Sequence, residues 1–194
     1  GHSARDVYKM LNSEGVALEA KGIAMGVRLE HPQTLIDSLR YHSAQGRGQY
    51  LPPAEYTQLT RVDGRGVYSF CMCPGGFVVP SQTAPEQIVV NGMSASGRNS
   101  RWSNAAVVVE TRPEDIPAEF KNKAKETGCK DLAGLLWRNY IENLTFKNGN
   151  GQKAPAQRIK DFVDGKESKD LPETSYTPGV VSSRLDLWLP KQIS

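Results

Sequence analysis

Two cysteines separated by one residue, Cys71 and Cys73, lead directly into Pro74, Gly75 and Gly76 between apolar runs. A thiol acts as a nucleophile, or two thiols act as a redox pair, when a nearby positive charge stabilises the thiolate. Proline fixes φ, while paired glycines allow positive φ and let a ligand approach the main chain closely. We therefore expect a functional site here, where backbone and sulfur are presented together at the end of a strand.

The residues leave two interpretations of Cys71 and Cys73 open. In one, the pair relays electrons or supplies a nucleophile. In the other, the two residues are small, soft side chains that pack closely. Their one-residue spacing in a strand makes a shared structural disulfide strained, and the total of three cysteines is odd. Reduced thiols, as in a reducing compartment, are therefore expected.

A second polar segment, Asn91-Gly92-Met93-Ser94, follows a dozen residues later and opens a basic loop that ends at Trp102. Arg98 and Arg101 in this loop have the chemistry to neutralise an anionic substrate or a cofactor phosphate. The same composition also suits an ordinary solvated loop. Both interpretations of the two arginines stay open.

The N-terminal turn is a third candidate. Gly1, His2, Ser3 and Arg5 precede an apolar pattern of helical spacing that ends near Gly15. Small residues before a helix leave backbone N–H groups free for an anion, and Arg5 adds a positive charge. The alternative is an ordinary surface helix that Ser3 caps.

The elements that must position these residues are mostly strands. A turn at 63–65 separates two β-rich runs and predicts a hairpin. A helical apolar spacing over 34–41 interrupts the β-rich pattern. The strands that we expect, and that together favour an antiparallel sheet, are 16–19, 23–30, 56–62, 66–73, 77–79, 87–91 and 104–110.

The pattern becomes helical after Pro113. Apolar residues from Leu132 to Leu144 recur with a period near 3.6, which predicts an amphipathic core helix. A shorter helical face follows from Ile159 and ends near Gly165. The sequence thus predicts an α+β protein in which residues 1–111 and 171–194 form a mainly antiparallel β-rich body, and residues 112–170 form a helical insertion subdomain.

Composition excludes several classes of protein. The 194 residues are 38% hydrophobic and 23% charged, with a net charge of +3. Such a chain has enough apolar residues for a core, and its dispersed charge does not favour nucleic acid as a partner. It has no apolar run of membrane-spanning length and no signal peptide, so we expect a cytoplasmic protein without membrane contact. His2, His31 and His42 lack the spacing of a metal site, and no metal is expected.

Five segments resemble one family, in the order in which they occur: residues 1–6, 26–33, 67–76, 91–94 and 155–158. The chain resembles the uncharacterised bacterial FAD-dependent dehydrogenases, sometimes labelled NAD-utilising dehydrogenases, within the flavoproteins of the two-dinucleotide-binding fold. The resemblance covers nearly the whole chain. Its most specific parts are the Cys-Met-Cys-Pro-Gly-Gly segment and the Gly-Val-Arg-Leu-Glu-His-Pro-Gln segment.

This resemblance implies the inserted middle domain of a larger oxidoreductase, excised from it, with the β-rich body of residues 1–111 and 171–194 on the substrate side. The Gly-rich dinucleotide fingerprint and the final FAD segment of the family are missing from this sequence, so FAD is expected in the parent protein and not on this fragment alone. The expected partners are the missing FAD-binding domain of the same parent chain and a small-molecule substrate, with NAD(P)H as a further cofactor.

The resemblance also implies which residues face the flavin cleft. In this expectation, Cys71 and Cys73 are redox candidates, and Arg98 and Arg101 are candidates for substrate binding. The residues expected to lie near the cofactor are Gly1, His2, Ser3, Arg5, Pro74, Gly75, Gly76, Asn91, Gly92, Met93 and Ser94. The alternative function is a non-catalytic module that binds a small ligand or a partner protein.

Overall fold

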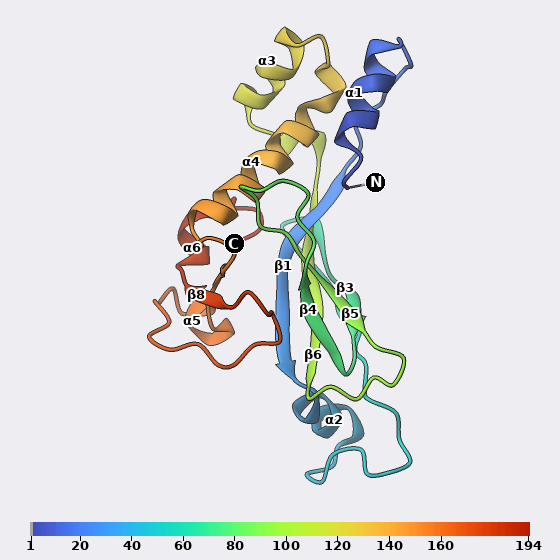
Figure 1. The fold of residues 1–194 in the computed structure, drawn as a ribbon, viewed down its shortest axis with the longest axis vertical. Helices are drawn as coiled ribbons and strands as arrows, with labels where there is room; N and C mark the ends of the chain where they lie inside the picture. Colours follow the sequence, from blue (N-terminus) through green and yellow to red (C-terminus); the bar gives the residue numbers. More distant parts are fainter. Residues whose placement is uncertain (1) are drawn as a thin grey trace.

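A computed structural model describes residues 2–194 and shows a mixed α+β fold. Figure 1 shows an elongated molecule with α1, α3 and α4 at one end, α2 at the other and the strands between them. The elements, in chain order, are α1 (Arg5–Ser13), β1 (Ile23–Pro32), α2 (Gln33–Tyr41), β2 (Leu59–Val62), β3 (Arg65–Cys73), β4 (Gly76–Pro80), β5 (Val90–Ser94), β6 (Trp102–Thr111), η1 (Pro113–Asp115), α3 (Ala118–Glu126), η2 (Lys130–Leu132), α4 (Ala133–Lys147), β7 (Ala154–Ala156), α5 (Ile159–Val163), β8 (Val180–Ser182) and α6 (Leu185–Trp188).

The main sheet has four antiparallel strands in the order β1-β6-β3-β2. The predicted α+β class with a mainly antiparallel sheet is therefore confirmed. The predicted hairpin is β2–β3, in which Val62 pairs with Arg65. Asp63 and Gly64 between them both have positive φ, at 50° and 73°. Two positive φ angles give the turn the twist that matches the strands on either side.

The longest pairing joins β1 to β6 over ten residue pairs, from Ile23 opposite Thr111 to Pro32 opposite Trp102. Gly26 lies at a point where the backbones crowd together. A Cβ at this position would lie 1.8 Å from the carbonyl oxygen of Val107. No side chain fits at that distance, so the register of β1 on β6 depends on glycine at position 26.

A second layer is the β4–β5 hairpin, in which Phe77 pairs with Met93 and Val78 with Gly92. The hairpin contacts β3 and β6 of the main sheet. Its base is held by a core cluster of Val78, Ile88, Ala154 and Tyr176. The short parallel pair β7–β8 joins this cluster through Ala154 and Val180, so the segment after α4 returns to the hairpin.

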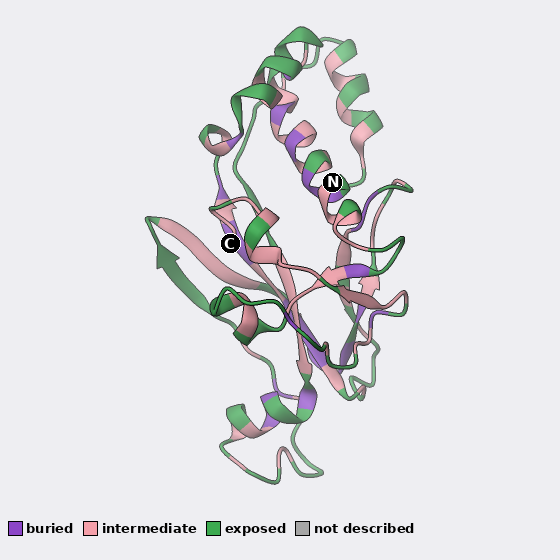
Figure 2. Ribbon diagram, turned by 90° about the vertical axis from the view of Figure 1, so that its left-hand side faces the viewer, coloured by how far each residue is buried: buried purple, intermediate pink, exposed green. Residues whose placement is uncertain are grey.

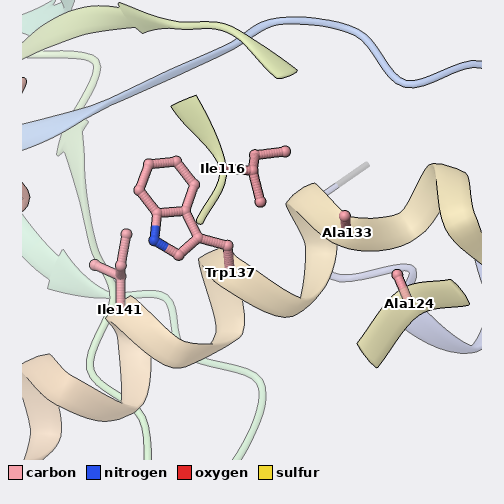
Figure 3. Close-up of a cluster of buried hydrophobic side chains, with 5 residues drawn as sticks. All are labelled: Ile116, Ala124, Ala133, Trp137 and Ile141. Atoms are coloured by element: carbon pink, nitrogen blue, oxygen red, sulfur yellow. The ribbon is translucent and has the colours of Figure 1, made fainter. Parts of the chain in front are cut away.

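A separate core cluster fixes the helices. Trp137 and Ile141 of α4 pack with Ile116, Ala124 and Ala133, as Figure 3 shows. Met25 of β1 packs against the same cluster. The predicted amphipathic helix at 132–144 is thus confirmed as α4, and its apolar face is core.

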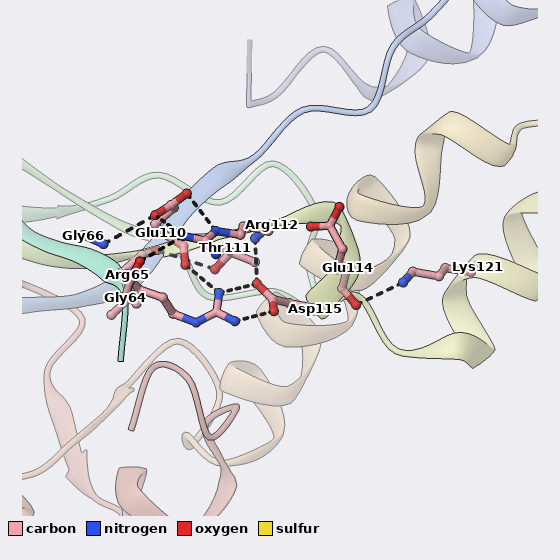
Figure 4. Close-up of polar contacts among 10 residues, drawn as sticks. Gly64, Arg65, Gly66, Glu110, Thr111, Arg112, Glu114, Asp115 and Lys121 are labelled. Carbon is pink, nitrogen blue, oxygen red and sulfur yellow. Dashed lines mark hydrogen bonds and ion pairs between the residues drawn. The ribbon is translucent and has the colours of Figure 1, made fainter. Parts of the chain in front are cut away.

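A polar clamp joins the β2–β3 turn to the start of the helical segment (Figure 4). Arg65 donates two hydrogen bonds to Asp115, at 2.5 and 2.6 Å. Arg112 donates to Glu110 and to the carbonyl of Gly64. These hydrogen bonds lower the pKa of Asp115, chiefly through Arg65, and lower the pKa of Glu110, chiefly through Arg112. The pairing keeps both carboxylates charged.

Buried residues are few; they lie along the strands, in α4 and at the start of α2, as Figure 2 shows. The accessible surface is 11786 Å². A monomeric protein of this mass exposes about 9,100 Å² by the usual scaling. The domain therefore leaves much more surface open than a self-contained protein of its size.

Three local predictions were wrong. Residues 16–19 form no strand, because no neighbouring strand is available to pair with them. The strand predicted at 87–91 is displaced to β5 at Val90–Ser94, since Ile88 is used in the core instead. Ser3 does not cap α1; the N-cap is Ala4, with no side-chain capping bond. No helix within residues 2–194 is long and apolar enough to cross a membrane.

We predict that Gly26→Ala lowers the free energy of unfolding by about 3 kcal/mol, because the added methyl group forces β1 away from β6. Urea unfolding monitored by circular dichroism measures the change. Gly97→Ala is the matched control, since a Cβ there would lie 3.6 Å from its nearest neighbour, Asn99. Equal stabilities for the two variants would contradict the argument.

Candidate functional site

One arginine joins four strands at the point where the sequence places its candidate site. The guanidinium of Arg28 on β1 donates to Asn104 Oδ1 on β6 at 2.7 Å and to Asn91 Oδ1 on β5 at 3.1 Å. It also donates to the carbonyl oxygen of Cys71 on β3 at 3.3 Å. We call the set Arg28, Cys71, Cys73, Asn91, Gly92 and Asn104 the Arg28 cluster. The planar guanidinium of Arg28 carries several donors and so holds the β4–β5 hairpin and the main sheet in one arrangement.

The two cysteines lie on a β-bulge. The pairing of β3 with β6 shifts register between Phe70 and Cys73, and Cys71 has a left-handed φ of 48°. Such a φ is costly for any residue with a side chain, and bulges re-aim the side chains that they carry. Here Cys73 is turned inward and is 6% exposed, whereas Cys71 is exposed. The Cys73 thiol donates to the Cys71 carbonyl at 3.4 Å.

The environment of Cys73 keeps its thiol protonated. Burial raises its pKa most, and the neighbouring Cys71 raises it further, while Arg28 acts in the opposite direction. Close packing, one of the two interpretations of the cysteines, accounts for Cys73. It does not account for Cys71, which lies at the surface.

The glycines after the cysteines serve close contacts within the chain. Gly75 has φ 52°, and a Cβ on it would lie 1.9 Å from the carbonyl oxygen of Arg98. Its N–H donates to the buried Gln33 side chain at 2.7 Å. A Cβ on Gly76 would lie 2.5 Å from the carbonyl oxygen of Met93. The close approach that the glycines allow is made by the protein's own backbone.

The segment from Asn91 to Ser94 lies beside the cysteines, as expected for one site. A Cβ on Gly92 would lie 2.2 Å from Asn104 Oδ1 and 2.7 Å from Cys73 Sγ. The Ser94 hydroxyl donates to the Pro74 carbonyl at 2.8 Å, which fixes the corner between β3 and β4. Met93 is exposed on the outer face of the hairpin.

The N-terminal turn is held elsewhere, on α4. His2 Nε2 lies 2.6 Å from Glu142 Oε1, and Arg5 donates to Glu142 Oε2 at 2.6 Å and to Gln87 at 2.7 Å. Glu142 is 6% exposed. Arg138 donates to the His2 carbonyl at 2.7 Å. Gln87 leads into β5, so this turn is connected to the Arg28 cluster through one segment; Gly1 lies outside the described residues.

Arg98 and Arg101 already have acidic partners. Arg98 pairs with Glu55 at 2.7 Å, and Arg101 pairs with Glu173 at 2.5 Å and stacks on Trp102. All four charged side chains are at least half exposed. Exposed pairs of this kind exchange partners at little cost. Substrate binding by the two arginines stays a prediction.

Sequence reasoning missed the residues that hold the site together. Arg28 and Glu30 lie within the 26–33 segment that carries the family resemblance, which was the available signal. Glu30 accepts hydrogen bonds from the hydroxyl and backbone N–H of Ser175, and the Ser175 hydroxyl in turn accepts one from the Val78 backbone N–H. Asn104 is fully buried near the start of β6, next to Ser103, where its polar side chain alone does not reveal that it is buried.

A histidine and a tyrosine pair near the end of β1. His31 Nε2 lies 2.9 Å from the hydroxyl of Tyr56, and the rings meet edge to face. Burial lowers the pKa of His31 against the opposing effect of Glu30. Burial also raises the pKa of Tyr56. Both side chains are therefore held neutral at pH 7.

The residues fit one side of a flavin site and not an enclosing pocket. Arg28 Nε and Asn104 Nδ2 are buried donors without a hydrogen-bond partner among residues 2–194. A flavin ring offers carbonyl and ring-nitrogen acceptors. These acceptors match the two unpaired donors, which belong to the same cluster as the exposed Cys71 and Asn91. However, the glycine positions are filled by the chain itself, and two cavities, of about 590 and 260 Å³, lie instead between α1, residues 15–21 and the α3–α4 corner.

The fold defines a two-layer α+β domain, in which the Arg28 cluster joins the β4–β5 hairpin to the main sheet. The family described as "FAD-dependent protein, C-terminal domain-like" matches residues 22–194. The chain belongs to this family, and the resemblance to a domain of FAD-dependent proteins is confirmed. It is also 41% identical over its whole length to an uncharacterized protein of Clostridium beijerinckii. The chain spans 35% of that relative, about a third of its length.

We predict that Arg28→Ala lowers the free energy of unfolding by about 2 kcal/mol, because buried Asn104 loses a charged hydrogen-bond partner. Arg28→Lys should recover part of the loss through a single donor. Arg61→Ala, which removes an exposed arginine from β2, is the control and should change stability little. Denaturant unfolding provides the measurement. An Arg28→Ala variant with an unchanged free energy of unfolding would show that the hydrogen bonds of Arg28 do not stabilise the fold.

His31 predicts a pH dependence. Because its pKa is lowered in the folded state from the ordinary 6.5, the unfolded chain binds the proton more readily. Stability contributed by His31 is thus present above pH 6.5 and is lost as the pH falls below it. Unfolding in urea at about pH 7.5 and about pH 5.5 should show this fall, reduced in His31→Gln. The exposed His42 gives the control, His42→Asn; an unchanged fall in His31→Gln would refute the assignment.

Proposed function

We propose that this domain forms the substrate-side wall of the flavin site in a longer FAD-dependent oxidoreductase, and that FAD is bound mainly by the rest of that protein. The family match and the length of the bacterial relative support a larger protein around the domain. Bound FAD would supply the hydride or electron transfer. The part left to this domain is to orient a small-molecule substrate and to exclude water.

The observation that carries the proposal is the exposed apolar surface beside the Arg28 cluster. Phe70, directly before Cys71, is 60% exposed, and Met93, two residues after Asn91, is 61% exposed. Phe77 is exposed opposite Met93 on β4. Apolar side chains of this size, left open beside a partly buried polar cluster, are typical of a surface that another part of the protein covers.

The large accessible surface supports the same conclusion. The domain exposes roughly 2,700 Å² more than the usual scaling gives for its mass. Inter-domain interfaces within one chain bury about 600 to 1,500 Å². An interface of that size with the rest of the parent protein would therefore cover part of this excess.

The catalytic details of the proposal rest on the family resemblance. We propose a cytoplasmic dehydrogenase that exchanges a hydride between FAD and NAD(P)H or a substrate. The cleft-facing residues would be the exposed edge of the Arg28 cluster, with Arg98 and Arg101 available to an anionic substrate once they leave Glu55 and Glu173. The N-terminal turn would approach the cleft from the Glu142 side.

We predict that the full-length protein is purified with FAD and shows absorption maxima near about 370 and about 450 nm, whereas residues 1–194 alone bind no stoichiometric FAD. Absorbance after gel filtration measures both. A colourless full-length protein that cannot be loaded with FAD would contradict the proposal and favour the non-catalytic module. Stoichiometric FAD on the isolated domain would contradict the expected division of labour.

FAD retention in variants of the full-length protein tests where the proposed wall lies. In the full-length protein, Phe70→Ser with Met93→Ser should weaken FAD retention at least about tenfold, which is the loss expected for apolar anchors of an interface. Val163→Ser changes a 77% exposed side chain on α5 and should have no effect. Equal FAD retention in both variants would place the interface elsewhere.

A further inference from the structure

The proposed function leaves the exposed thiol of Cys71 without a role. Cys71 lies at the surface, on a bulge, in a backbone conformation that costs a residue with a side chain about 1 to 2 kcal/mol. Packing does not explain this arrangement, because the side chain that packs is that of Cys73. Strain retained at a surface position next to a second thiol is an observation that points toward chemistry.

The bulge also changes the geometric argument against a disulfide between Cys71 and Cys73. In a regular strand, thiols two residues apart stand side by side and a disulfide between them is strained. The register shift between Phe70 and Cys73 adds a residue to β3, and the Cys73 thiol donates to the Cys71 carbonyl at 3.4 Å. Arg28 holds that carbonyl from the other side. The Cys71 thiol also lies near enough to raise the pKa of Cys73 through a side-chain hydrogen bond.

We propose that Cys71 and Cys73 form a dithiol redox centre with unequal roles, in which exposed Cys71 exchanges with a low-molecular-weight disulfide and buried Cys73 resolves the mixed disulfide. This proposal does not depend on the proposed flavin site. The difference in exposure decides the roles: a disulfide in solution can reach the Cys71 sulfur, while Cys73 can reach only its neighbour. The third cysteine, Cys129, lies outside this pair after α3.

The reaction balances as two thiol–disulfide exchanges. The Cys71 thiolate attacks one sulfur of the external disulfide, whose S–S bond breaks and releases one thiolate. Cys73 then loses its proton and attacks the Cys71 sulfur, and the mixed S–S bond breaks to release the second thiolate. Two protein thiols are oxidised to one disulfide, the external disulfide is reduced to two thiols, and the two protein protons pass to the released thiolates.

Cys73 controls the direction of this couple. Its raised pKa keeps the reduced form protonated at neutral pH, with burial as the main cause and Cys71 as the second. Arg28 lies close enough to lower the cost of the Cys73 thiolate. A thiol with a raised pKa favours the reduced dithiol, so a relatively oxidising disulfide pool is needed to close the bond.

The test uses oxidised glutathione as the probe on native protein, followed by trypsin and mass spectrometry. Residues 66–98 contain no lysine or arginine before Arg98, so both cysteines fall in one tryptic peptide, separate from Cys129. We expect this peptide to lose the mass of two hydrogen atoms without retaining glutathione. A wild-type peptide that keeps glutathione on Cys71, or that does not react, would overturn the proposal.

Single variants test the unequal roles. Cys73→Ser should accumulate glutathione on Cys71, because no resolving thiol remains. The rate at which Cys73 reacts with oxidised glutathione in Cys71→Ser should be at least tenfold lower than the rate for Cys71 in Cys73→Ser. Unfolding in urea should abolish this difference. Cys129→Ser is the matched control and should behave like the wild type. Equal rates for the two cysteines in folded protein would refute the assignment of roles.

The same measurement separates this proposal from the flavin proposal. It can be made on the full-length protein by following peptide 66–98 whether or not FAD is bound. A disulfide between Cys71 and Cys73 in a full-length protein that binds no FAD would support the dithiol centre and contradict only the flavin proposal. A flavoprotein whose peptide 66–98 stays reduced would retain its proposed function and lose the dithiol centre.

Discussion

The arrangement of both layers depends on the guanidinium of Arg28. Its donors reach β3, β5 and β6 from β1, so a single planar group sets how the β4–β5 hairpin lies on the main sheet. Burying such a charge is costly unless its hydrogen bonds are made. The neighbouring Gly92 leaves room for this group, because a side chain there would occupy the space of Arg28 and Asn104. The bulge that carries Cys71 is held by the same arginine.

The glycines of the Cys71–Gly76 corner have a different use from the one their sequence suggests. Gly75 lets the carbonyl of Arg98 approach the turn between β3 and β4, and Gly76 lets the carbonyl of Met93 on β5 approach the start of β4. The physical requirement is the same as for a bound ligand, namely the absence of a Cβ, so sequence alone does not distinguish the two. The accessible part of the corner is instead its rim, where Phe70, Cys71 and Met93 are exposed.

The distribution of buried residues fits a domain that forms one side of a larger protein. Two small core clusters, one around Trp137 and one around Ile88, hold the helical end of the molecule and the base of the β4–β5 hairpin. Between them the layers meet through polar side chains, with Asn104 and Ser103 fully buried. A polar seam of this kind gives a fixed geometry without a large apolar core, and it leaves apolar side chains outside that a neighbouring part of the protein can cover.

The sequence by itself determined the elements whose signals are local: the β2–β3 turn at Asp63-Gly64, the α4 helix from its apolar period, the antiparallel β-rich body and the family resemblance. It also gathered Cys71, Gly75 and Asn91 into one candidate site. Only the tertiary structure decided that Arg28 and Asn104 join these segments, that Cys71 faces outward while Cys73 faces inward, and that the N-terminal turn is held by Glu142. Those outcomes depend on which strands become neighbours and on one added residue in β3, and both are set by long-range packing that no local pattern records.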